Sequence, residues 1–462
     1  MPRLIRGAKV FKARTARLDI TGGPVRETLL RLALPVIVLN ILKAGYNIVD
    51  MFWIGRLGAD YLAGVSGSVF LVWAIHGLSH LITTGITAGV SRNAGEGRED
   101  LAAMNAGRSL LHTVWVGLLI TLLVYPLAPL LIRYVGMSAV ATVAGIQYLE
   151  VMAAFTVVIF LMFSLHSIMI ARGDTVMPVR VYGATFVLNI VLSPVLMFGI
   201  GPFPRLETRG AAYATIVSYL VACLWFWWLM RRRGWVSFRG AGLPGIIPLR
   251  RYISLGYPIA LTGMMFSFIY FFIANVTARF GDAAVGAMGI GHRVESIAYF
   301  FSFGLATGLS SFVGQNIGAG RPERAVEATR HALRVVALLS LFYTVFTMVT
   351  APFLVSLFND EPGLVAFGVA YIYIVMPAEV LQSLLIVIED GAFTGAGYTR
   401  PSFTVSLPIT LARIPLAWFL AVFCGFGAGG IWATIALTMA LNAFFFLALY
   451  RRDDWLKVKI VS

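Results

Sequence analysis

Long apolar stretches alternate with short polar loops along the whole of this 462-residue chain. Each stretch runs for about 20 residues or more, which is the length that an α-helix needs to cross a hydrocarbon core of about 30 Å. The predicted spans lie near residues 29–54, 61–90, 105–131, 142–170, 176–200, 210–230, 252–279, 283–313, 327–357, 364–390, 401–425 and 427–450. They are too long and too continuously apolar for the strands of an outer-membrane barrel. The pattern therefore predicts an all-α polytopic membrane protein with about twelve transmembrane helices.

The second half of the chain repeats the first at a shift of 223 residues, which places Pro35 on Pro258 and Arg56 on Arg279. The loop after the second span reads NAGEGR at 93–98 and NIGAGR at 316–321. Two six-span halves in the same orientation form a parallel repeat about an axis along the membrane normal. This predicts two pseudosymmetric bundles that face each other across a central cleft and rock to give alternating access.

The predicted organisation has two lobes, one linker and two tails. Its segments are a basic tail at 1–28, an N-terminal lobe at 29–230, a linker at 231–251, a C-terminal lobe at 252–450 and a tail at 451–462. The linker is basic and rich in Gly and Pro, as expected for a connector outside the membrane.

Basic residues lie mostly on one side of the predicted membrane. Of the 36 Lys and Arg, 28 fall in the tails or in alternate loops, five in the opposite loops and three inside spans. This bias predicts a multi-pass protein of the inner (plasma) membrane with both termini cytoplasmic. It also explains the net charge of +15 without nucleic-acid binding, since the charge is spread over membrane-facing loops. The tail 1–28 has no long apolar core, so it is predicted to be a cytoplasmic segment that contacts lipid headgroups rather than a signal peptide.

Asp50 stands in an otherwise apolar run, PVIVLNILKAGYNIVDMFWI. A carboxylate at bilayer depth costs roughly 2.5–3.5 kcal/mol on insertion scales, and such residues usually belong to an ion or substrate path. Its counterpart in the repeat is Ile273, so the scaffold does not require it. Asp50 is predicted to bind a proton or Na⁺, with Lys43, two helical turns earlier, as a modulating charge. The two side chains start roughly 10 Å apart along the helix axis, so direct contact would need a water or a bend, which Gly45 permits. The alternative is a buried structural ion pair or network.

Other polar residues occur within the spans of the N-terminal lobe. Asn189 and Ser193 precede Pro194, and a proline inside a span frees carbonyls that form either a cation site or a plain kink. His76, His80 and His166 are candidates for a proton relay because imidazole titrates near neutrality, although packing roles are the commoner explanation.

The C-terminal lobe carries its own charges inside spans, and its repeat partners lack them. Arg293 and Glu295 fall on different faces of one helix, while the pair Glu389 and Asp390 lies near the cytoplasmic end of another. The sequence favours structural pairing, in which Glu389 or Asp390 binds Arg413, or Arg293 binds Glu295. The alternative is that these residues bind cationic substrates or protons in the cleft.

Signatures of soluble enzymes are absent from the sequence. It contains no Walker A motif, and glycine runs such as GAFTGAG lack the strand context of a dinucleotide site. Small residues of this kind let membrane helices pack closely. Cys223 and Cys424 sit in apolar stretches without metal-ligand or disulfide spacing. We therefore expect neither an enzymatic activity nor a cofactor other than a coupling ion.

The chain resembles the multidrug and toxic-compound extrusion (MATE) family from about residue 25 to 450. The motifs that carry the resemblance are YNIVD and IGRLG around the first span, the paired loops NAGEGR and VGQNIGAGRPERA, ARGDTVMP and GAGYTRP after the fourth span of each half, and GAAYAT at the sixth. The resemblance implies a monomer of twelve helices in two lobes. It also implies export of organic cations and other amphipathic compounds in exchange for H⁺ or Na⁺.

The resemblance further implies a cation site in the N-terminal lobe. Asp50 matches the family's first-span carboxylate, and Asn189, Thr215 and Tyr148 match polar residues that line its site. The sequence departs from the pattern at Ser193, where many members carry a second aspartate. A single carboxylate favours H⁺, although Na⁺ held by Asp50 with carbonyl and hydroxyl oxygens is the alternative.

A flippase for a lipid-linked oligosaccharide, of the same broad superfamily, is the alternative function. Its cleft would need several cationic residues to hold a pyrophosphate. The predicted spans offer Lys43, Arg293 and Arg413 for that role. This small number of cations makes the flippase the weaker hypothesis.

Overall fold

The computed structural model describes residues 22–95, 97–174, 176–238, 246–398 and 400–457, and within these ranges the ordered elements are all helices. The α-helices are α2 (Val25–Gly55), α3 (Ala59–Leu78), α4 (His80–Gly95), α5 (Glu99–Val135), α6 (Ala139–Ala154), α7 (Thr156–Ala171), α8 (Val176–Phe198), α9 (Glu207–Arg233), α10 (Ile246–Ala278), α11 (Asp282–Gly318), α12 (Pro322–Val349), α13 (Ala351–Ser356), α14 (Pro362–Ile386), α15 (Thr394–Ala396), α16 (Leu407–Trp418) and α17 (Gly427–Tyr450). Short π-helices, η1 (Val387–Phe393), η2 (Ser402–Ser406) and η3 (Phe419–Phe423), adjoin α14 and α16, and a 3₁₀-helix, η4 (Asp454–Lys457), follows α17.

The helices fall on the twelve predicted spans. Within the described ranges, nine helices are long and apolar enough to cross a membrane, and the bent pair α6–α7 brings the number to ten. The remaining two predicted spans correspond to α2 and α10. The second span is broken at Ser79 into α3 and α4, and the fourth bends by 55° at Phe155. The all-α prediction with two six-span halves is confirmed.

Glycines that match in the sequence repeat have the same backbone role in both halves. Gly97 and Gly320 follow the second span of each half with φ of +73° and +71°. Gly173 and Gly397 follow the fourth span with φ of +80° and +78°. Residues with a Cβ rarely adopt this left-handed conformation, so each pair fixes the same turn at the same end of the bundle.

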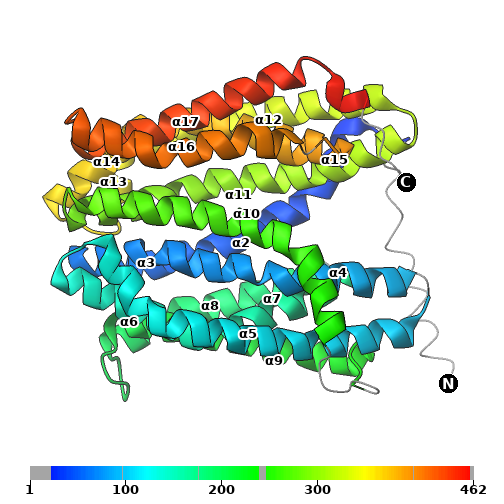
Figure 1. The fold of residues 1–462 in the computed structure, drawn as a ribbon, viewed down its shortest axis with the longest axis horizontal. Helices are drawn as coiled ribbons and strands as arrows, with labels where there is room; N and C mark the ends of the chain where they lie inside the picture. Colours follow the sequence, from blue (N-terminus) through cyan, green and yellow to red (C-terminus); the bar gives the residue numbers. More distant parts are fainter. Residues whose placement is uncertain (1–21, 96, 175, 239–245, 399, 458–462) are drawn as a thin grey trace.

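Helix α2 passes from one lobe to the other. Near its start, Ala33 packs on α11, where a Cβ on Gly308 would lie 2.8 Å from the Ala33 backbone nitrogen. Further along, Gly45 packs on α8, where a Cβ would lie 2.7 Å from the Phe186 ring. Figure 1 shows α2 between the two layers of helices. Helix α2 is continuous from Val25 to Gly55, and Gly45 permits its close packing on α8.

Helix α10 makes the equivalent crossing from the other side. Its Tyr252 lies against Gly85 of α4 and accepts a hydrogen bond from Ser109 of α5, at 2.8 Å between the two hydroxyl oxygens. Further along α10, the Tyr270 hydroxyl accepts a hydrogen bond of 2.6 Å from Arg413 of α16. In Figure 1, α10 runs across the gap between the layers in the same way. Helices α2 and α10 therefore link the two lobes.

The two lobes are joined at the end of the bundle opposite to the start of α2, which we call the closed end. On one side, the Asn359 amide, after α13, donates to the Gly55 carbonyl at the end of α2, at 2.9 Å. On the other side, the turn between α5 and α6 meets the turn between α10 and α11. There the Ser138 backbone N–H donates to the Asp282 carboxylate at 3.0 Å, and the Asn275 amide donates to the Tyr134 carbonyl at 2.6 Å. The two contact sets join the same two regions of each half, so they follow the pseudosymmetry.

We expect Asp282→Ala to loosen the closed end. The substitution leaves the Ser138 N–H without its cross-lobe acceptor, and a hydrogen bond to a charged group contributes about 1.5–3 kcal/mol. Spin labels on Val140→Cys and Glu361→Cys, both exposed positions at this end, should report a longer mean distance by pulsed electron resonance. Asp60→Ala, at an exposed acidic residue in the first turn of α3, is the matched control and should leave the distance unchanged. Equal distances in Asp282→Ala and the parent protein would show that the Asp282–Ser138 contact does not hold the closed end together.

Candidate cation site and central cavity

Asp50 lies in a buried polar pocket formed by α2, α8 and α9. Its carboxylate accepts a hydrogen bond from the Ser193 hydroxyl at 3.0 Å and another from the Thr215 hydroxyl at 2.7 Å. The Asn189 amide donates to the Thr215 hydroxyl oxygen at 3.3 Å. Asp50 is 6% exposed, and Asn189 and Ser193 are fully buried. The structure therefore brings together four of the five residues that the sequence and the resemblance placed in the cation site.

Helical spacing produces this convergence. Asn189 and Ser193 are four residues apart, so they share one face of α8, and this face meets Asp50 on α2. A buried carboxylate is tolerated only where hydrogen bonds replace its hydration, and the two hydroxyls supply them. The side-chain carbonyl oxygen of Asn189 has no hydrogen-bond partner among the described residues. The pocket thus offers a carboxylate and neutral oxygens, which can hold a proton on Asp50 or supply oxygen ligands to Na⁺. A group of three or more His, Cys, Asp or Glu suited to a metal is absent from the described ranges.

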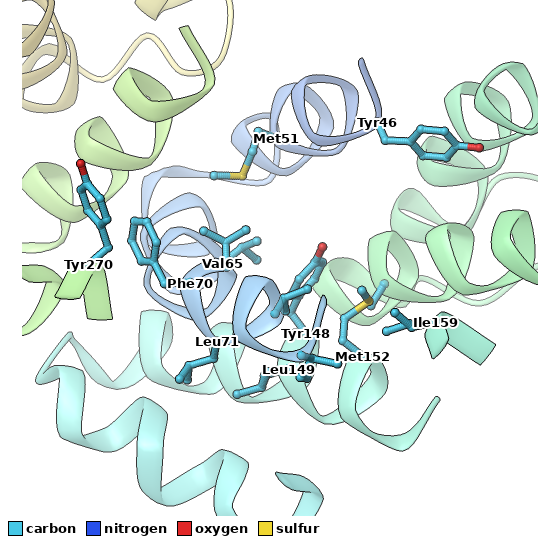
Figure 2. Packing of buried hydrophobic residues seen from close by; sticks show 14 of the residues in the cluster. Tyr46, Met51, Val65, Phe70, Leu71, Tyr148, Leu149, Met152, Ile159 and Tyr270 are labelled. Carbon is cyan, nitrogen blue, oxygen red and sulfur yellow. The ribbon is translucent and has the colours of Figure 1, made fainter. Parts of the chain in front are cut away.

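A layer of tyrosines separates this pocket from the central cavity. Tyr46 precedes Asp50 by one helical turn, and its hydroxyl donates to Thr185 at 2.6 Å. Its ring lies 6.0 Å from the Tyr219 ring, centroid to centroid. Both tyrosines line the cavity, whereas Asp50 does not. Tyr148, the fifth predicted site residue, is buried in α6 and interacts electrostatically with Asp50; Figure 2 shows Tyr46 and Tyr148 among the packed residues of this region.

A cavity of about 670 Å³ lies between the lobes. Its charged lining residues all come from the C-terminal half: Arg293, Glu295, Glu379, Glu389, Asp390 and Arg413. Its aromatic lining comes from both halves and includes Tyr46, Trp73, Phe163, Tyr182, Tyr219, Phe266, Tyr270, Tyr299 and Phe300. The cavity volume suits a small organic molecule, and the lining combines aromatic surface with few charges, as ligand sites usually do.

The C-terminal wall of the cavity carries a buried network around Glu295. The Tyr371 hydroxyl donates to the Glu295 carboxylate at 2.5 Å, and His292 Nδ1 lies 3.3 Å from the other carboxylate oxygen. Glu379 is 2% exposed, and its Oε1 has no hydrogen-bond partner among the described residues. A carboxylate oxygen buried without a partner is costly, so this wall is suited to receive a donor or a cation from the cavity.

The predicted pairings of the charges in the C-terminal lobe are wrong. Arg293 donates to the Gly289 carbonyl of its own helix at 3.0 Å rather than to Glu295. Arg413 donates to the Thr438 hydroxyl at 2.8 Å and to the Tyr270 hydroxyl at 2.6 Å. Both guanidinium groups therefore donate to neutral oxygens, and neither forms an ion pair with a carboxylate among the described residues.

The remaining predicted residues have different positions. The side chain of Lys43 lies outside the described part of the structure. His80 is exposed at the start of α4, with its ring 3.4 Å from the Thr83 hydroxyl, and it is not among the cavity-lining residues. His166 packs its ring 5.4 Å from the Tyr182 ring. His76 does line the cavity, next to Phe163.

Three residues of the network around Glu295, namely Glu379, His292 and Tyr371, were not among the residues predicted from the sequence. Glu379 lies inside the predicted span 364–390, so the criterion applied to Asp50, a carboxylate at bilayer depth, would have identified it. His292 lies inside the predicted span 283–313, so the imidazole criterion applied to His76 and His166 would have identified it. Tyr371 carries no comparable signal, because a tyrosine in an apolar span is usually a packing residue.

Known proteins show the same organisation. The MatE family model matches residues 35–195 and 258–419, two matches that begin 223 residues apart. The chain is 25% identical over 433 residues to a probable multidrug resistance protein NorM of Thermotoga maritima, with 92% of each chain covered. It is 28% identical over 409 residues to an FAD transporter of Shewanella oneidensis, with 87% of this chain and 88% of that one covered. Among solved structures, the inward-facing conformation of a multidrug resistance MATE family transporter matches with a TM-score of 0.82 at 22% identity, over 93% of this chain and 100% of that one.

Proposed function

This chain belongs to the MATE family of membrane transporters and is not an enzyme. We propose that it exports organic cations or other amphipathic compounds in exchange for H⁺ or Na⁺. The observation that carries the proposal is a buried carboxylate, Asp50, beside a cavity lined by aromatic rings and further carboxylates. Two separate sites on one two-lobed protein suit alternating access, in which an ion and a substrate favour different arrangements of the lobes.

The charge of the cavity lining favours a cationic substrate. Four carboxylates face the cavity against two arginines, and Arg413 is already bound to two neutral hydroxyls. Aromatic rings add cation–π attraction, which contributes about 0.5–2 kcal/mol for a desolvated cation. A flippase for a lipid-linked oligosaccharide would instead need basic groups for its pyrophosphate, and the described lining offers only Arg293 and Arg413.

The composition of the Asp50 pocket favours H⁺ as the coupling ion. Ser193 stands opposite Asp50 and contributes a hydroxyl instead of a second carboxylate. A single carboxylate is enough to bind a proton, and it becomes neutral when it does so. Na⁺ would need neutral hydroxyl and carbonyl oxygens of the pocket as further ligands. Ions are expected to reach Asp50 past the tyrosine layer of Tyr46 and Tyr219.

The distribution of basic residues gives the proposed orientation. Most of them lie at the end where α2 begins, which we assign to the cytoplasm. The closed end would then face outward, and the cavity would be reached from the cytoplasm. The similarity to a transporter structure described as inward-facing supports this assignment.

Transport by everted membrane vesicles tests the proposal. With an inside-acid pH gradient, vesicles that contain the protein should accumulate ethidium, a fluorescent organic cation, whereas an imposed Na⁺ gradient alone should have no effect. FAD serves as an anionic comparison substrate, because a relative with 28% identity is an FAD transporter. Accumulation of FAD without accumulation of ethidium would reject the proposed substrate class, and a response to Na⁺ alone would reject proton coupling.

A further inference from the structure

Helix α11 of the C-terminal lobe touches the N-terminal lobe beside Asp50. At Gly289 there is no space for a side chain, because a Cβ would overlap Ser66 of α3 and would lie 3.2 Å from the terminal methyl of Met51. Met51 follows Asp50 directly in α2 and is 1% exposed. The two lobes therefore meet here, at the depth of the cation site.

Arg293 lies one helical turn after Gly289 on the same helix and is 3% exposed. One arm of its guanidinium donates to the Gly289 carbonyl at 3.0 Å, which holds the side chain along α11 toward this contact. Its Nε has no hydrogen-bond partner among the described residues. Arg293 acts electrostatically on Asp50, although less than burial and the side chains of Thr215, Ser193 and Asn189 do.

We propose that Arg293 is a tethered cation, supplied by the opposite lobe, that competes with the coupling ion for the charge of Asp50. The inference rests on the proposed function and assigns a positioning role that the N-terminal pocket alone cannot supply. Arg293 aligns with Phe70 in the sequence repeat, so the shared scaffold does not require a charge at this position.

When the closed end is joined, the contact at Gly289 holds the part of α11 that carries Arg293 against Met51, the residue after Asp50. In this arrangement the positive charge of Arg293 favours an anionic Asp50, so it lowers the affinity for the coupling ion and promotes ion release. By reciprocity, an ion bound at Asp50 disfavours the joined arrangement by the same factor. The attraction between Arg293 and Asp50 also holds the ion-free protein in the joined arrangement until a substrate enters. It therefore limits changes of arrangement with neither ion nor substrate bound.

The surroundings of the two groups allow a matched control. Tyr46, Tyr148 and Tyr219 are the other titratable groups that interact with Asp50, and all three are neutral phenols. Arg413 is a second buried arginine of the same cavity, 4% exposed, and it is bound to Thr438 and Tyr270 instead. Removing its charge should therefore leave the Asp50 pocket unaffected.

A double-mutant cycle on the lobe equilibrium tests the proposal. In a protein that carries Cys223→Ser and Cys424→Ser, spin labels on Val140→Cys and Glu361→Cys report the joined and separated populations at the closed end at one fixed pH. Asp50→Asn and Arg293→Gln should each shift the ratio toward the separated form by about fivefold or more. The double variant should shift it no further than either single variant, while Arg293→Lys should stay near the parent ratio.

Additive shifts of Asp50→Asn and Arg293→Gln would overturn the inference, as would an equal shift in Arg413→Gln. Arg293→Met provides a second uncharged variant, with an apolar chain that fits the lobe contact if glutamine is not tolerated. The lobe equilibrium is measured without substrate, so its outcome is independent of the transport assay. Loss of ethidium transport with an intact cycle would reject the proposed substrate, and an additive cycle with normal transport would reject the role of Arg293 alone.

Discussion

Replacing Asp50 with asparagine is expected to abolish ion-driven export, by roughly 100-fold or more, while the protein still folds and binds substrate. The amide has nearly the same shape as the carboxylate, and its oxygen can accept from Thr215 at the position now 2.7 Å away. The Ser193 hydroxyl can rotate to accept from the new NH₂ group. The variant therefore keeps the hydrogen-bonded pocket and loses only the group whose charge responds to the ion. Substrate binding should persist because Asp50 does not line the cavity.

Two measurements separate these effects for Asp50→Asn. Uptake of ethidium by everted vesicles under an imposed pH gradient reports coupled export, and ethidium fluorescence polarisation with the purified protein reports binding. Asp60→Asn removes an exposed carboxylate at the start of α3 and should leave both signals at the parent level. Export at the parent rate by Asp50→Asn vesicles would show that this carboxylate does not couple ion and substrate.

The positions of the spans were predictable because a helix that crosses the hydrocarbon core needs a continuous apolar stretch, and such a stretch can be recognised from neighbouring residues alone. A different signal, the matching loops of the two repeats, marked the turns at Gly97 and Gly320, and the structure shows that both glycines are left-handed. The crossing of α2 between the lobes was not predictable. Ala33 and Gly45 are both small residues in one apolar helix, and only the tertiary structure decides that one faces α11 and the other α8.

The polar sites divide in a similar way. Asp50 was identifiable from its cost in an apolar span, but its contacts with Ser193 and Thr215 join residues that are more than 140 positions apart along the chain. The resemblance placed them together, whereas spacing alone did not. The expected partner of Arg413 was a carboxylate, and the structure gives it two hydroxyls, since a guanidinium needs acceptors rather than negative charge. Charge pairing read from a sequence therefore overlooks the neutral oxygens that lie nearer in space.

The double variant Glu295→Gln/Glu379→Gln is expected to weaken binding of an organic cation by about 10- to 100-fold. Hydrogen bonds and contacts to a charged group contribute about 1.5–3 kcal/mol, and each 1.4 kcal/mol is tenfold in affinity. Both carboxylates line the cavity and are at least nine-tenths buried, so solvent screens them little. Glutamine at position 295 can still accept from Tyr371, so the network around the cavity should remain folded. Fluorescence polarisation of ethidium with the purified protein measures the change in dissociation constant.

Glu323→Gln, in the first turn of α12 and outside the cavity, is the control for a general effect of lost acidic charge and should bind ethidium normally. The spin-label distance at the closed end should still respond to Asp50→Asn in the Glu295→Gln/Glu379→Gln background, because the ion pocket lies behind the tyrosine layer. The two variants thus separate the sites: Asp50→Asn loses coupling and keeps binding, while the glutamate variant loses binding and keeps the ion response. Unchanged ethidium affinity in the glutamate variant would place the substrate elsewhere in the cavity, against its aromatic N-terminal wall.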